Sequence, residues 1–196
     1  MQPIKFLERL YVDYISMKYL LKYFLACFLF VPSLIFAQSD EEEMLDWNSS
    51  RELTWADYKA KPNPLSDAAA STTTTLVVNY DITSVSFKYK IQSRFSKTRS
   101  WGLHKTDYIL SHEQGHFDIA EIFARKLHQK LSEYKFDKKT YQKDLKKIYE
   151  AVTKEKEEIQ NNYDKETNHS IKKKEQADWL KKIAAMLEEY ADWADY

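Results

Sequence analysis

A long amphipathic helix is predicted after Trp101 and Gly102. Its buried face follows three- and four-residue spacing and carries Ile109, His112, His116, Ala120, Phe123, Leu127 and Leu131. Residues four apart on a helix are turned by only about 40 degrees, so both histidines on this face point the same way. The fold must therefore be built around a helix that holds two imidazoles side by side.

Two strands are predicted before this helix. Residues 71–80 and 85–92 form an antiparallel hairpin, because the second segment shows clean alternation of apolar and polar residues and turn-forming residues separate the two. Residues 38–70 are predicted to be irregular, apart from a short helix that Thr54 caps together with Asp57.

Two more helices are predicted after the first. One starts at Asp137 and continues to Tyr163, and the other begins near Ser170. Residues 164–169 between them are polar and are predicted to form a loop. We therefore expect an α+β fold over residues 71–196, in which a small antiparallel sheet packs on the histidine-bearing helix and two long helices follow.

The first 37 residues are predicted to be a signal peptide. Two lysines precede an apolar run over residues 24–37, and acidic residues follow it. The run is too short for a comfortable membrane span of roughly 20 residues. Met17 begins this pattern better than Met1 does, which indicates an early start-site assignment. We expect an exported protein, periplasmic or secreted, with no stable membrane span after cleavage.

Composition limits the partners and the redox chemistry. Lys and Arg total 30 and Asp and Glu total 30, so the net charge of zero gives no electrostatic reason to expect nucleic acid binding. The single cysteine, Cys27, lies within the predicted signal peptide, so we expect no disulfide in the mature chain. The sequence leaves the oligomeric state open.

The segment His-Glu-Gln-Gly-His, residues 112–116, has the HExxH pattern of zinc-binding helices. It predicts a Zn²⁺ ion bound by His112 and His116. Glu113 would take a proton from a bound water, whose pKa the metal lowers to about 7. Gly115 in mid-helix costs about 1 kcal/mol relative to alanine and needs a reason. The two candidate reasons for this glycine are the close approach of a strand or substrate backbone, and plain packing.

A catalytic zinc site requires a third protein ligand. His169 is the predicted one, since it lies in the predicted loop and can fold back over the metal. Asp164 and Glu166 are the carboxylate alternatives. His128 points about 120 degrees away from His116 around the helix and is expected at the surface. His104, which precedes the helix, has no supporting context.

Several segments carry a resemblance to a known family. They are residues 51–58, 68–70, 100–101, 110–125 and 163–170, followed by Gln176 and Trp179. Together they resemble the bacterial domain of unknown function 922, described as predicted secreted zinc-dependent proteases of the zincin type. The resemblance implies His112 and His116 as ligands and Glu113 as base, and it makes residues 163–169 the second half of the site. The family has glycine after the last histidine, whereas this chain has Ser170.

These residues predict an exported zinc-dependent peptidase-like hydrolase that acts on a peptide or protein. Tyr163 is the candidate donor to the developing oxyanion, and Asp164 or Glu166 can orient a ligand. The outer strand of the hairpin can bind an extended peptide by strand addition. The alternatives are a non-catalytic binding module of the envelope on a zincin-like scaffold and a purely structural helical protein. Glu113 favours catalysis, because a structural metal site has no use for a base.

Overall fold

The computed structural model describes residues 42–196. The predicted signal peptide lies outside the described residues. In the described part of the chain, no helix has both the length and the apolar character needed to cross a membrane.

A three-stranded antiparallel sheet is built on a long hairpin. β3 (Thr74–Ile82) pairs with β4 (Phe87–Ser96) along its whole length, which confirms the predicted hairpin, and β1 (Met44–Asp46) pairs with the other edge of β4. β2 (Ala70–Ser71) and β5 (Trp101–Gly102) form a second, two-stranded sheet. β1 falls in the segment predicted to be irregular, because three residues are too few to show an alternating pattern and their pairing partner is distant in sequence.

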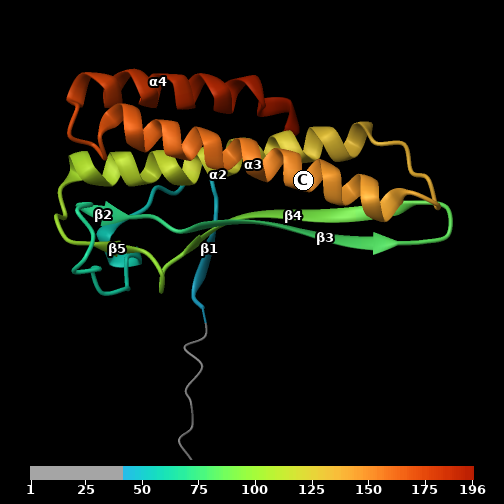
Figure 1. The fold of residues 1–196 in the computed structure, drawn as a ribbon, viewed down its shortest axis with the longest axis horizontal. Helices are drawn as coiled ribbons and strands as arrows, with labels where there is room; N and C mark the ends of the chain where they lie inside the picture. The colour runs from blue at the N-terminus through green and yellow to red at the C-terminus, as the bar shows by residue number, and fades with distance from the viewer. Residues whose placement is uncertain (1–41) are drawn as a thin grey trace, which may run out of the picture. The chain divides into compact units, whose positions relative to one another are not determined.

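Three helices lie on one face of the hairpin (Figure 1). α2 (Asp107–Glu133) packs on β3 and β4, and α3 (Tyr141–Thr167) and α4 (Lys173–Glu189) pack against α2 and against each other. Two single-turn 3-10 helices, η1 (Trp55–Asp57) and η2 (Ala191–Trp193), complete the described elements. The fold is therefore α+β with a small antiparallel sheet and three helices, as predicted.

α2 is the central element of the core. Leu76 and Ile91 of the hairpin belong to the same buried cluster as Ile122 of α2, Val152 of α3 and Ile183 of α4. Every α2 residue from 119 to 125 is buried. A helix enclosed in this way has little freedom to move, so side chains that project from it are held in fixed positions.

The end of α3 differs from the prediction. Residues 164–167, expected in a loop, form the last turn of the helix, and Asn168 ends it with a left-handed φ of 49°. A final turn made of Asp, Lys, Glu and Thr has the composition of a loop, although none of these residues prevents a helix. The difference matters because it places Asp164 on a rigid helix.

Candidate metal centre

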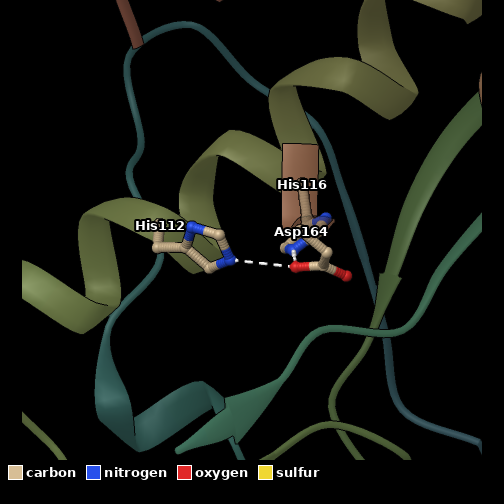
Figure 2. Close-up of side chains that lie close together, drawn as sticks. All are labelled: His112, His116 and Asp164. Carbon is tan, nitrogen blue, oxygen red and sulfur yellow. Dashed lines mark hydrogen bonds and ion pairs between the residues drawn. The ribbon is translucent and has the colours of Figure 1, made fainter. Parts of the chain in front are cut away.

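His112 and His116 project from α2 toward the last turn of α3 (Figure 2). The Nε2 atom of each imidazole lies 3.1 Å from Oδ1 of Asp164. One donor atom from each of the three side chains lies within 4.8 Å of the other two. The four-residue spacing thus brings both imidazoles to one place, where a carboxylate meets them.

Gln160, one turn before Asp164 on α3, fixes the tautomer of His116. Its Nε2 donates to the backbone carbonyl of His116 at 2.8 Å, so its Oε1 faces Nδ1 of the same histidine within hydrogen-bond distance. An amide oxygen can only accept, so Nδ1 carries the proton. The Nε2 atom of a neutral His116 then presents a lone pair to the Asp164 carboxylate. That contact is favourable only with a cation between the two atoms, either a proton or a metal ion.

Tyr163 packs behind the histidines. Its ring stacks on that of His112 with centroids 4.4 Å apart, and its hydroxyl donates to the His112 carbonyl at 3.3 Å. A Cβ added to Gly115 would lie 2.7 Å from the Tyr163 hydroxyl oxygen, so the glycine is explained by side-chain packing. Because Tyr163 is fully buried and its hydroxyl is engaged with the α2 backbone, its role as an oxyanion donor stays a prediction.

Glu113 follows the first histidine and is also buried. Its Oε2 atom has no hydrogen-bond partner among residues 42–196. A buried carboxylate oxygen without a partner costs free energy, and a polar group of a ligand or a water molecule would remove that cost. Glu113 is therefore available to accept a proton from a molecule bound beside it.

A cavity of about 370 Å³ lies over these side chains. It is lined by α2 at His112, Glu113 and His116, by the face of α3 that includes Asp164, and by residues 68–74, which run through β2 into β3. The cavity therefore brings the three side chains of the cluster and Glu113 to the wall of one space that a ligand can enter.

Charge is organised around Asp164. Burial alone would raise the pKa of this carboxyl, but hydrogen bonds from His112 and His116 outweigh burial and hold the pKa well below its usual range. Burial likewise opposes protonation of His116, yet Asp164 raises the pKa of this imidazole, whereas burial lowers the pKa of His112. An ionised carboxylate between two imidazoles is an environment that attracts a cation.

The turn after α3 places His169 beside the cluster. Asn168, His169 and Ser170 all have positive φ angles, 49°, 50° and 72°, a conformation that costs residues other than glycine roughly 1 kcal/mol or more each. The Nδ1 atom of His169 lies 3.3 Å from Oδ1 of Asp164, and its side chain is 57% exposed. His169 therefore sits at the edge of the cavity, and its role as a metal ligand stays a prediction.

The remaining predicted or considered residues lie elsewhere. Glu166 accepts a hydrogen bond from the indole nitrogen of Trp179 at 2.7 Å and does not line the cavity. His128 contacts the Tyr89 hydroxyl at 3.0 Å, and His104 is exposed. Of the three predicted candidates for a third ligand, Asp164 is the one whose donor atom lies close to both helix histidines.

Residues 39–170 match the family described as "Bacterial protein of unknown function (DUF922)". The chain belongs to the DUF922 family. No curated protein and no solved structure gives a significant match. The segment matched to DUF922 contains all of α2 and α3 with the whole cluster, and α4 lies beyond it.

Two residues of this DUF922 site escaped the sequence analysis. Gln160 and Lys156 line the cavity and lie one and two turns before Asp164. Four-residue spacing puts all three on one face of a helix. Because residues 164–169 were expected to form a loop, Asp164 was not placed on the same helix face as Lys156 and Gln160.

The donor set of the cluster fits zinc. Two imidazole nitrogens and one carboxylate oxygen are a known ligand set of catalytic zinc sites. Bonds of about 2.0–2.2 Å around a tetrahedral ion put neighbouring ligand atoms roughly 3.4 Å apart. The two 3.1 Å separations to Asp164 Oδ1 are close to that spacing, and Gln160 gives His116 the tautomer that leaves Nε2 free to bind a metal.

Proposed function

We propose that this DUF922 protein is an exported zinc-dependent peptidase-like hydrolase. One arrangement carries the proposal: the Nε2 lone pair of His116 faces the ionised carboxylate of Asp164, and Glu113, whose carboxylate has an oxygen without a partner among the described residues, lines the same cavity. His112 and His116, through Nε2, and Asp164, through Oδ1, would hold the metal. Asp164 thus takes the place that the sequence analysis assigned first to His169.

The chain itself would supply the proton transfer and the positioning. A bound zinc ion supplies Lewis acidity and lowers the pKa of a water to about 7. The Glu113 carboxylate would accept a proton from the attacking water and later return it to the leaving amine. Gln160 holds the His116 ring by accepting from Nδ1, and the Tyr163 ring stacks on that of His112 and limits its tilt.

An extended peptide is the substrate that suits the cavity. Residues 68–74 form one side of it and continue into β3, an outer strand of the three-stranded sheet. Among residues 42–196, no strand pairs with the outer edge of β3. The Tyr149 hydroxyl of α3 already donates to the Leu76 carbonyl of β3. The other backbone groups on this edge have no strand partner in the described part of the chain and could bind a peptide by strand addition where β3 begins beside the cavity. Export, to the periplasm or out of the cell, rests on the charged, apolar and small-residue pattern of residues 1–37.

Metal content of the purified protein tests the proposal. We expect near one zinc per chain by mass spectrometry, lost in His112→Ala, His116→Ala and Asp164→Ala but kept in Glu166→Ala. His169→Ala decides between the two ligand sets, since it keeps the metal if Asp164 is the third ligand. A wild-type protein that stays metal-free after zinc is supplied would overturn the proposal.

Activity separates catalysis from metal binding alone. With an unfolded, fluorescently labelled protein as substrate, we expect Glu113→Gln to keep its zinc and lose about 10²–10⁴-fold in rate, the usual contribution of a general base.

Gln160→Ala should weaken zinc binding by about 10–100-fold in a chelator competition, as loss of a hydrogen bond to a ligating histidine does. Gln142→Ala, near the exposed start of α3, is the control. Full zinc occupancy without hydrolysis would favour the non-catalytic binding module.

A further inference from the structure

One lysine is buried in the wall of the cavity. Among the described residues that line it, Lys156 is the only lysine or arginine. Its side chain is 7% exposed, whereas that of Lys154 on the same helix is 79% exposed. Lysine is rarely buried to this extent without partners that satisfy its charge. The position of Lys156 therefore needs an explanation beyond a solvated helix surface.

The contacts of Lys156 leave its ammonium group incompletely paired. Its one ionic partner among residues 42–196 is Glu157, whose Oε1 lies 2.8 Å away and whose side chain is 63% exposed. An ammonium group has three donors, so one exposed carboxylate leaves two of them for other acceptors. Glu113, Glu157 and Asp164 bring three negative charges to the cavity, which a divalent metal and Lys156 together would balance. Because the Glu157 side chain is exposed and can turn to solvent, a carboxylate of a bound molecule could take its place beside Lys156.

The helix sets the distance between Lys156 and the metal ligands. Lys156 and Asp164 are eight residues apart on α3, which corresponds to about 12 Å along the axis and a turn of about 80 degrees around it. An extended peptide advances about 3.3 Å per residue, so 12 Å spans roughly three to four residues. A peptide bound along residues 68–74 with its reactive bond at Glu113 would pass Lys156 at that separation.

From this placement, we infer that Lys156 selects peptides that carry a carboxylate about three to four residues from the cleaved bond. The inference rests on the proposed function and specifies its substrate class. The carboxylate can belong to an Asp or Glu side chain or to the peptide's C-terminus, since both offer the same charged acceptor. Lys156 acts as a specificity-determining residue and takes no part in proton transfer.

Matched peptide sets test the inference. The first contains acetylated decapeptide amides of neutral residues with one glutamate scanned through every position, and the second has glutamine in its place. A third set has neutral residues and a free C-terminal carboxylate. We expect the zinc-loaded protein to cleave the best glutamate peptides about tenfold faster than their glutamine partners, the size of effect that one charged hydrogen bond gives. The third set reveals whether a C-terminal carboxylate serves as well.

Variants at the buried and the exposed lysine assign the effect. Lys156→Met should abolish the preference for glutamate over glutamine, Lys156→Arg should keep part of it, and Lys154→Met should leave it unchanged. Zinc content and circular dichroism check that each variant is folded. Equal cleavage of the glutamate and glutamine sets, or an unchanged preference in both Lys156 variants, overturns the inference and leaves the proposed hydrolase intact.

Binding gives a second measurement that needs no turnover. Zinc-loaded Glu113→Gln protein should bind the glutamate peptides about tenfold more tightly than the glutamine peptides in fluorescence polarisation, and Lys156→Met should remove that difference. If this result is found but no peptide is cleaved by the wild-type protein, Lys156 recognises carboxylates and the hydrolase proposal fails. Equal binding of both sets overturns the inference.

Discussion

The glycine at position 115 lowers the stability of α2, but it leaves room for the Tyr163 side chain to lie against this helix. The expected effect of Gly115→Ala combines a gain of about 1 kcal/mol in helix propensity with a larger loss from overpacking, typically about 1–3 kcal/mol. The loss should dominate because the added Cβ would meet the Tyr163 hydroxyl at 2.7 Å and two ring carbons at 3.0 Å. We therefore predict a lower free energy of unfolding in urea titrations.

Replacing the partner provides the control for that substitution. In a Tyr163→Phe background the nearest clashing atom is absent, so Gly115→Ala should cost less there than in the wild type. A Gly115→Ala protein that is more stable than the wild type would show that packing is not the reason for the glycine.

The two helix histidines should titrate on opposite sides of their ordinary pKa of 6.5. In metal-free protein, Asp164 raises the pKa of His116 despite burial, and burial lowers that of His112. A raised pKa adds stability that is present below pH 6.5 and is lost as the pH rises through the higher folded-state value. The destabilisation caused by His116→Ala should therefore shrink as the pH rises above 6.5. NMR titration of the imidazole protons checks that the pKa of His116 is raised and that of His112 is lowered. In the same measurement, Asp164→Asn should lower the pKa of His116.

At the scale of elements, the turn that ends α3 carries its own conformational cost. Ser170 has a φ of 72°, which glycine adopts without the steric cost that a Cβ brings. Ser170→Gly should therefore stabilise the protein by up to about 1 kcal/mol, although the greater freedom of glycine in the unfolded chain offsets part of the gain. Ser170→Ala, which keeps the Cβ, should give no gain. Thermal unfolding of the two variants side by side tests this account.

Local sequence pattern was enough for some elements and not for others. Alternation in β4 and the spacing from Ile109 to Leu131 predicted the hairpin and α2, because each segment is long enough to show its period. β1 could not be predicted, since its three residues are ordered by pairing with β4. In the site, the positions of His112 and His116 relative to each other could be predicted, because both lie on one helix and their spacing is a local pattern. The choice between Asp164 and His169 depends on how α3 meets α2, which no local pattern contains.

At the scale of the whole molecule, the last residues of the chain close over α2. The Tyr196 hydroxyl donates to Oε2 of Glu121 at 2.5 Å, and Oε1 of the same buried carboxylate accepts from Arg125 at 2.9 Å. Tyr196→Phe would leave one buried charged oxygen without its partner, at a cost of about 1–3 kcal/mol. We expect a lower melting temperature for this variant. Tyr190→Phe, in the segment that leads to the same tail, is the control, because Tyr190 packs against the core.

The contact between His116 and Asp164 joins two helices at positions 48 residues apart in the chain. A cation held there would act as a removable cross-link, because it would bind the folded chain and not the unfolded one and so add its binding free energy to the stability. Residues 42–196 contain no cysteine, so no disulfide can serve this purpose in the described domain. Resistance of the domain to proteolysis would then depend on how much metal its surroundings supply.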